Sequence, residues 1–495
     1  MTVHVRGFHR RQQLLLPDTV EDYVADSNSV RVIDTFVDRR VDLAALGFTH
    51  TEPQETGRPS YDPADMTKLL LYGYLNQIRS SRKMEQECHR NLEVIWLIRE
   101  LAPDHKTISD FRKNNVDRIQ PLFRELHRFL VELGLIGDDL VGIDGTKLRA
   151  VNAVDRSLNA QKIEERLKQL DEKISRYLKE LDENDQKEEG ESQLPQHVKD
   201  LPKKLEKLQK KKALYESVQK QMDETGEQEV SLTDPECHTM KNHGTLEPSY
   251  NGRVVVDSKE KMIVNYDADS NASDRQSLAE MSKEAKEILG VEKLKVVADK
   301  GFHSAKELQD CLDNGITPYV PKPDHEAGAA KTHGTSLAFS KDKFVYDSST
   351  DSYLCPAGQR LPFWREIHRT WSSNPDGETV KHYRAKACLS CPHHLKGCTT
   401  NKEGRIFTRG EYEEAVKRTD ALRTTPKGQA MVELRKTLVE HPFGTIKRAM
   451  NQGYLLLKGR RKVKGEFGLT CIAYNLRRAI NIVGTEGLVA RMTTA

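Results

Sequence analysis

Leu140-Val-Gly-Ile-Asp144-Gly145 and Leu294-Lys-Val-Val-Ala-Asp299-Lys300 are two short apolar runs, and each leads into an aspartate. A bounded apolar run of about four to eight residues is typical of a strand buried inside a sheet. Both segments are therefore predicted to be core strands, with Asp144 and Asp299 at their ends.

Strands and helices alternate around these two segments. Period-two patterns at 253–257 and 262–266 predict a β-hairpin. Helices are expected over 274–289 and 304–314, and a further strand at 316–320. This alternation indicates an α/β sheet with helices packed on it.

Two regions of helical spacing flank and interrupt the sheet. From about Asp62 to Gly137 the pattern predicts an all-α N-terminal domain, in which Thr107 or Ser109 caps the helix after Pro103 and Asp104. A heptad-like seam predicts an antiparallel coiled-coil hairpin inserted into the sheet domain. Its apolar residues are Ile163, Leu167, Leu170, Ile174, Leu178 and Leu181, then Val198, Leu201, Leu205 and Leu208.

The C-terminal part is expected to be irregular from Pro321 to about Gly404, where Pro, Gly, His and Cys are frequent. Helices are expected over 427–450, which carries Glu440, and over 467–483. The predicted units are a helical N-terminal domain (1–137), a catalytic α/β domain (138–155 and 230–320), the inserted hairpin (156–229), a cysteine-rich insertion (321–426), and a segment with the helix of Glu440 and a basic C-terminal part (427–495).

Charge is unevenly distributed in this chain of 495 residues, of which 37% are hydrophobic and 31% charged. The formal net charge is only +3, yet residues 435–478 hold eleven Lys or Arg against two acids. A local basic block in a nearly neutral chain indicates a surface for a polyanion. No apolar run reaches the roughly 18 residues that a membrane span needs, and residues 1–11 lack a signal-peptide core, so we expect a cytoplasmic, nucleoid-associated protein.

Acidic side chains at the ends of neighbouring strands converge on one edge of an α/β sheet. Mg²⁺ or Mn²⁺ prefers such oxygen ligands, and a site for two ions needs at least one shared carboxylate and one further carboxylate on each side. Glu440, on a predicted helix, is the candidate third acid. Taken singly, the two aspartates could be turn residues, and Glu440 could lie on a solvated helix face. The prediction of a two-ion site depends on their order of strand, strand and helix.

The motifs around these acids have a known counterpart. They are Gly142-Ile-Asp144-Gly-Thr-Lys147, Pro248-Ser-Tyr-Asn251, Ala298-Asp-Lys-Gly-Phe-His303-Ser304 and Val439-Glu-His-Pro-Phe-Gly-Thr-Ile-Lys447. The chain resembles bacterial insertion-sequence DDE transposases of the group with an Ala-Asp-Lys-Gly-Phe/Tyr-His-Ser motif and a Glu-His-Pro-Phe-Gly motif. The resemblance implies an RNase H-like catalytic fold and the acidic triad Asp144, Asp299 and Glu440. It also implies a homodimer acting on DNA, with the element's terminal inverted repeats and target DNA as partners.

A related signature places a tyrosine and an arginine before the glutamate and a lysine seven residues after it. Lys447 matches the lysine position, whereas Lys436 replaces the arginine, beside Arg435, and Glu433 replaces the tyrosine. Any hairpin-type processing linked to that signature is therefore left open.

Basic residues near the triad and along the N-terminal helices are predicted to contact DNA phosphates, which gives salt-sensitive affinity with little sequence information. A solvated helix face or loop is the alternative for each group. The candidates are Arg79, Arg82, Lys83, Arg112, Lys113, Lys436, Lys447, Arg448, Lys458, Arg460, Arg461, Lys462 and Lys464.

A cysteine cluster forms a separate candidate site. Cys388 and Cys391 have the spacing of a zinc knuckle, and Cys355 and Cys398 can complete a tetrahedral set for one structural Zn²⁺, with His393 or His394 able to replace one thiolate. Reduced free thiols and a redox role are the alternatives. Trp96, Trp364 and Trp371 are expected to pack rather than to stack on a DNA base.

Other functions are consistent with parts of this pattern. A nuclease of the same fold would cut DNA without joining it, and a non-catalytic derivative would only bind DNA. A coiled-coil interaction protein built on the hairpin would leave the acids at the strand ends unexplained. No small-molecule substrate and no membrane partner is expected.

Overall fold

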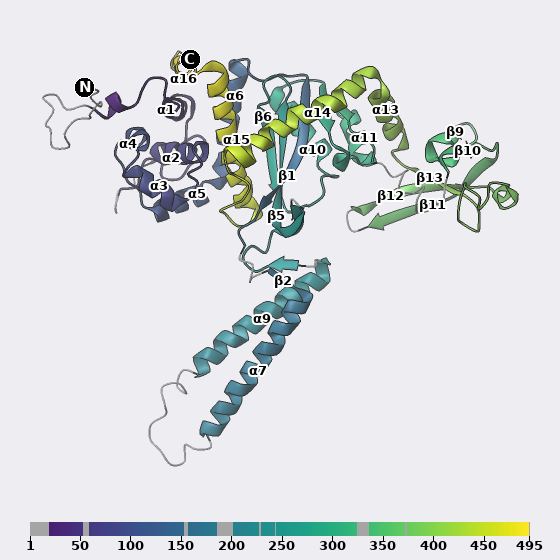
Figure 1. Cartoon of the computed structure of the whole chain (residues 1–495), viewed down its shortest axis with the longest axis horizontal. Helices are drawn as coiled ribbons and strands as arrows, with labels where there is room; N and C mark the ends of the chain where they lie inside the picture. Colours follow the sequence, from purple (N-terminus) through teal and green to yellow (C-terminus); the bar gives the residue numbers. More distant parts are fainter. Residues whose placement is uncertain are drawn as a thin grey trace, which may run out of the picture.

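The protein is built around a mixed six-stranded sheet (Figure 1). The order is β4-β5-β1-β7-β8, and β6 pairs with the other edge of β5. The computed structural model describes residues 19–52, 59–152, 157–185, 201–226, 229–242, 244–323, 336–371 and 374–494. The six strands are β1 (Leu140–Arg149), β4 (His238–Asn242), β5 (Thr245–Asp257), β6 (Ile263–Asp269), β7 (Leu294–Ala298) and β8 (Ile316–Tyr319).

Strand β1 is longer than predicted. It runs parallel to β7 only as far as Ile143 and Ala298, but it stays antiparallel to β5 up to the pair Arg149 and Ser249. The expectation that this strand stops at Asp144 is therefore wrong, because pairing with β5 extends it. Asp144 instead marks the point where β1 loses its parallel neighbour.

Helices cover both faces of the sheet. Val141, Ile143 and Val255 belong to a core shared with α10 (Leu278–Leu289) and α11 (Ala305–Asp313). Val254, Val256 and Val297 belong to a second core with α14 and α15. Because successive strand residues point to opposite faces, this alternation explains the continuous apolar runs of the sequence.

The N-terminal helices pack against the C-terminal end of the chain. Helix α15 (Arg460–Val483) lies between them and the sheet, and α16 (Thr485–Thr493) contacts α1. The helix expected over 467–483 thus begins seven residues earlier, at Arg460. The N-terminal helices are α1 (Val30–Arg40), α2 (Pro63–Leu75), α3 (Ser81–Cys88), α4 (Leu92–Leu97), α5 (His105–Asn114) and α6 (Ile119–Glu132).

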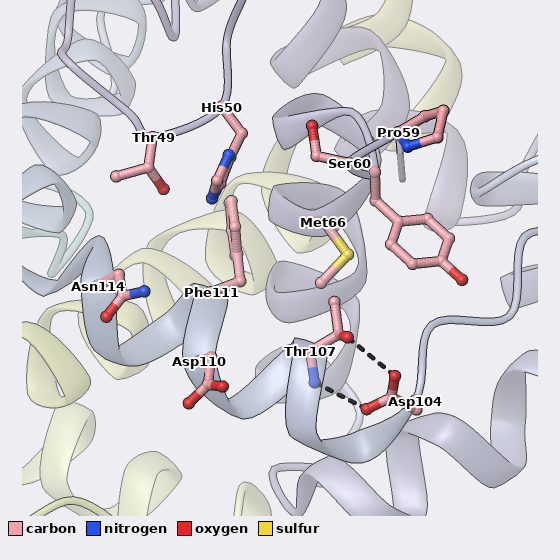
Figure 2. Close-up of a pocket in the computed structure, with 11 residues that line it drawn as sticks. Thr49, His50, Pro59, Ser60, Met66, Asp104, Thr107, Asp110, Phe111 and Asn114 are labelled. Carbon is pink, nitrogen blue, oxygen red and sulfur yellow. Dashed lines mark hydrogen bonds between the residues drawn. The ribbon is translucent and has the colours of Figure 1, made fainter. Parts of the chain in front are cut away.

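Helix α5 begins at a cap that the sequence analysis placed wrongly. Asp104, and not Thr107 or Ser109, is the N-cap, since its Oδ1 accepts the backbone N–H groups of Lys106 and Thr107 at 2.9 Å each. The Thr107 hydroxyl donates to the same carboxylate at 2.9 Å (Figure 2). An aspartate directly before the first helical residue satisfies two of the unpaired N–H groups there.

The predicted hairpin consists of α7 (Ala160–Asp185) and α9 (Leu201–Thr225), and it projects from the sheet (Figure 1). Its root is the strand pair β2 (Ser157–Asn159) and β3 (Glu229–Ser231). The apolar seam is best packed near this root, around Ile163 and Leu170, whereas Leu178 is exposed. Val198 and the side chain of Leu181 lie outside the described residues.

The cysteine-rich segment is not irregular, contrary to expectation. It forms a five-stranded antiparallel sheet in the order β13-β12-β11-β10-β9, and α13 (Glu413–Thr424) leads from it to α14 (Pro426–Gly444). Cross-strand pairing and the apolar side chains of its small core hold this sheet together. Its strands are β9 (Val345–Asp347), β10 (Ser352–Leu354), β11 (Arg360–Trp371), β12 (Asn374–Arg384) and β13 (Ile406–Gly410). Within the described residues, no helix combines the length and apolar character needed to cross a membrane.

Candidate active site

Asp144 and Asp299 occupy neighbouring positions on adjacent parallel strands. Ile143 pairs with Ala298, and Asp299 continues the extended backbone with φ −81° and ψ 173°. Adjacent strands lie ~4.8 Å apart, and paired positions face the same side of a sheet. The carboxylates of Asp144 and Asp299 are therefore brought to one place, as the sequence predicts.

Local hydrogen bonds orient both carboxylates. Asp144 Oδ1 accepts the backbone N–H of Gly145 at 2.8 Å, and Asp299 Oδ1 accepts that of Gly301 at 2.7 Å. Asp299 thereby caps the short 3₁₀ turn Lys300–Phe302. One oxygen of each carboxylate thus accepts a backbone hydrogen bond, and the second oxygen is left for another partner.

The electrostatic environment of Asp144 is unfavourable for an isolated anion. Burial raises the pKa of Asp144 to about 6, and the negative charges of Asp299 and Asp274 act in the same direction, although Gly145 N–H and Arg435 oppose them. A carboxylate shifted by burial and by a second acid is typical of a functional site, because a bound cation relieves both costs.

Helix α14 crosses the sheet directly above Gly142. Leu438 and Val439 are buried there, and a Cβ on Gly142 would lie 2.7 Å from Val439 Cγ1 and 2.8 Å from Leu438 Cδ2. The missing side chain of Gly142 lets the helix approach the strand. Gly142 and Asp144 are two residues apart and share this face of the sheet.

The two flanks of α14 face opposite ends of β1. His441 Nδ1 contacts Tyr474 Oη at 2.9 Å, and this hydroxyl donates to the carbonyl of Lys261, in the turn beside the start of β1. On the other flank, the π-helical turn Thr445–Ala449 carries Lys447, whose pKa is lowered by burial and by the charge of Lys147, beyond Asp144 on β1.

The side chain of α14 that touches Asp144 is Arg435, not Glu440. Arg435 Nη1 lies 3.4 Å from Asp144 Oδ2, whereas Glu440 is exposed. In the part of the chain that the structure describes, no three His, Cys, Asp or Glu side chains lie close enough together to hold a metal ion. The structure thus brings two acids of the predicted triad together, places the third on the adjoining helix, and adds an arginine that sequence reasoning did not assign to the site.

A buried polar network extends the site beyond Asp144. Arg253 is 2% exposed and bonds Asp269 at 2.9 and 3.1 Å and Asp274 at 2.7 Å. Asn251 donates to Asp274 at 2.6 Å. This network explains Asn251 of the second sequence motif, and it holds the Asp274 charge near Asp144.

Most of the predicted DNA-contacting residues are accessible. Arg461 lies 3.3 Å from Asp117 and Lys464 2.8 Å from Asp267, so part of the run at the start of α15 is already paired. The exposed ones are Arg82, Lys83, Lys113, Lys436, Arg448, Lys458, Arg460 and Arg461, and the half-buried ones are Lys447, Lys462 and Lys464.

Arg79 and Arg112 are buried, so the prediction that they contact DNA is wrong. Arg79 donates to the carbonyls of Tyr454 and Asn451 and lies 3.6 Å from Glu466, which is 1% exposed. Arg112 donates to the carbonyl of Arg79 at 2.9 Å. Both arginines balance the buried Glu466 and join α2, α3 and α5 to α15. Local sequence does not reveal this role, because the partners are distant in the chain.

The four clustered cysteines line one small cavity with His394. Gln359 N–H donates to Cys355 Sγ at 3.2 Å, and Cys391 N–H donates to the carbonyl of Cys388 at 3.3 Å. Burial raises the pKa of the Cys398 thiol, and the other three cysteines act in the same direction. The fold therefore gathers these four residues around one cavity although they are far apart in the sequence. Their thiols are not close enough together in this structure to hold a metal ion.

Comparison with known proteins gives two matches. A family model described as "Transposase domain (DUF772)" matches residues 18–114, the N-terminal helices. A second, described as "Transposase DDE domain", matches residues 354–480, from the cysteine-bearing sheet through α14 into α15. No curated protein and no solved structure shows significant similarity to the chain. Both matched models describe transposase domains, and they cover two separate segments of the chain.

Proposed function

We propose that this protein is a DDE transposase, which cleaves DNA at the ends of an insertion sequence and joins the freed 3′ ends to target DNA in a reaction that depends on Mg²⁺ or Mn²⁺. The observation that carries the proposal is that Asp144 and Asp299 directly follow Ile143 and Ala298, the last parallel pair of β1 and β7, with α14 packed over Gly142. In this proposal the six-stranded sheet is the RNase H-like catalytic domain.

Asp144, Asp299 and Glu440 would hold two divalent ions, which DDE transposases use. When bound, such ions activate the attacking hydroxyl and stabilise the leaving oxygen of an in-line displacement. Hard carboxylate oxygens fit this role, and the raised pKa of Asp144 means that a cation stabilises the ionised form of its carboxyl group. Glu440 completes the set once its exposed side chain turns toward the Asp144 side of α14.

The remaining side chains of the site have assignable tasks. Arg435 Nη1 lies 3.4 Å from Asp144 Oδ2 and balances its negative charge. A cation bound at Asp144 would balance that charge instead, and Arg435 could then contact a scissile phosphate. Lys436, Lys447 and Arg448 would bind phosphates next to the cleavage point, and Lys458 and Arg460 the flanking backbone. Two protomers are proposed to act together, because joining requires both ends of the element.

The test measures cleavage and strand transfer of labelled element ends by wild type, Asp299→Asn and Glu440→Gln. We expect both variants to lose both reactions by several orders of magnitude while they retain DNA binding. Lys436→Gln is the matched control on α14 and should weaken binding rather than abolish chemistry. Cleavage without joining in the wild type would favour the nuclease alternative, and binding without chemistry would favour a non-catalytic derivative.

We propose a second, structural metal at Cys355, Cys388, Cys391 and Cys398. Among the described residues of the segment 336–410, the core of this sheet consists of six buried hydrophobic residues: Phe344, Tyr353, Leu361, Tyr383, Ala385 and Phe407. So small a core is usually supplemented by a metal or by disulfides, and none of the eight cysteines forms a disulfide in this structure. Tetrahedral Zn²⁺ fits a set of four thiolates presented by two tight turns.

Zinc content of protein purified without added metal tests this assignment. We expect one zinc per chain, its loss in Cys388→Ser, and its retention in the control Cys311→Ala, which removes a buried thiol of another core. A folded wild-type protein with no zinc and freely reactive thiols would contradict the zinc site and leave the reduced-thiol alternative.

A further inference from the structure

Strands β11 and β12 carry a cluster of arginines and aromatic rings that the active site does not use. Arg365 Cζ lies 4.2 Å and Arg384 Cζ 5.1 Å from the ring centroid of Trp364. Arg369 Nη2 lies 3.2 Å from Nε2 of His382, whose ring is 6.5 Å from that of Trp364. We call these five residues the arginine–tryptophan patch.

The patch lies on the strand face that is turned away from the core of its own sheet. Leu361 and Tyr383 are fully buried in that core, whereas Arg365 pairs across the strands with His382, one residue before Tyr383, and so faces the other side. A register shift between Phe363 and Arg365 marks a bulge at Trp364. Such a bulge re-aims a side chain, and here it accompanies a tryptophan that is 42% exposed instead of packed.

The patch carries positive charge that the protein itself only partly balances. Arg384 is paired with Glu403 at 3.2 Å. Neither Arg365 nor Arg369 forms an ion pair with any residue that the structure describes. Burial lowers the pKa of His382, and the charges of Arg369 and Arg365 lower it further, so His382 adds a neutral ring between cations.

We propose that the arginine–tryptophan patch binds the phosphodiester backbone of duplex DNA outside the catalytic centre. The inference rests on the proposed function, which supplies DNA as the partner. A guanidinium group binds phosphate in a planar, two-bond geometry, and stacking on the indole ring holds it ready for that contact. Two-stranded ribbons are long enough to follow a groove of DNA, and β11 and β12 form the longest strand pair of this sheet.

Salt-dependent binding of a labelled mixed-sequence duplex tests the proposal with the full-length protein. Arg365→Gln with Arg369→Gln should make the slope of log affinity against log salt shallower by about 2, because each phosphate contact contributes ~0.9. Lys381→Gln is the control, since Lys381 neighbours His382 on the opposite face and is 3.5 Å from Asp351. It should leave the slope unchanged. Trp364→Ala, which removes no charge, should weaken binding about two- to fivefold at a constant slope.

The outcomes separate this inference from the proposed function. If the double variant binds with the wild-type slope, the patch does not contact DNA, even when cleavage remains intact. If it binds normally but changes the sedimentation of the protein, the patch is a protein interface and the proposal is overturned. Asp299→Asn should lose cleavage and keep the full salt slope, so a failure of the catalytic assignment leaves the patch testable.

Discussion

Gly142→Ala is the change that most directly tests how α14 is positioned over the acids. The added Cβ would lie 2.7 Å from Val439 Cγ1 and 2.8 Å from Leu438 Cδ2, where carbon atoms prefer ~3.5–4.0 Å. The helix would have to move away from β1 by about 1 Å, at a cost of about 1–3 kcal/mol for overpacking. Because Glu440 directly follows Val439, we expect a fall in cleavage of about 100-fold, the usual effect of a displacement of this size.

The assay is single-turnover cleavage of labelled DNA ends, with DNA affinity and thermal unfolding measured on the same samples. Gly444→Ala is the matched control on the same helix: its backbone is helical at φ −60° and ψ −45°, and an added Cβ meets nothing within 4 Å. It should cleave like wild type and be slightly more stable, by ~0.4–1 kcal/mol. Wild-type cleavage by a folded Gly142→Ala protein would refute the idea that contact of α14 with β1 positions Glu440.

Further predictions concern buried charge. Burial lowers the pKa of His127 to about 4 in the folded protein. Below about pH 6.5 the unfolded chain therefore binds a proton at His127 that the folded protein does not bind. The free energy of unfolding has its full value above that pH and falls by up to ~3 kcal/mol as the pH drops toward 4. His127→Leu should flatten this dependence in denaturant titrations, and an unchanged slope would contradict it. Arg79→Met should destabilise the protein by about 3–5 kcal/mol, since it removes the nearer of the two arginines that balance the buried Glu466, and the salt slope of DNA binding should stay at the wild-type value. A stable variant with a shallower salt slope would show that Arg79 does contact DNA.

Much of the fold follows from local pattern. The apolar runs before Asp144 and Asp299, the period-two hairpin, and the helical spacing of 62–137 and 163–208 each correspond to elements of the structure. Such patterns are readable because burial of a strand or a helix face requires apolar residues at a fixed period. The candidate acids were found in the same way, since Asp144 and Asp299 each directly follow a short apolar run.

The failures share one cause, which is contact between distant residues. Arg435 reaches Asp144 across 291 positions, and Arg79 is buried because Glu466 of α15 lies beside it. The five-stranded sheet of the cysteine-rich segment went unpredicted because its strands depend on cross-strand partners more than on their own composition.

The sequence by itself determined which residues are apolar, where the strands and helices of the six-stranded sheet and of the N-terminal region form, and which acids follow short apolar runs. Only the tertiary structure decided which charges meet a partner and which stay in water. A lysine or arginine has the same local signature in either setting, and its role depends on whether the fold places an acid, an aromatic ring or solvent next to it. Arg79 and Arg365 carry the same side chain, yet one is buried against Glu466 and the other is exposed on the face of Trp364.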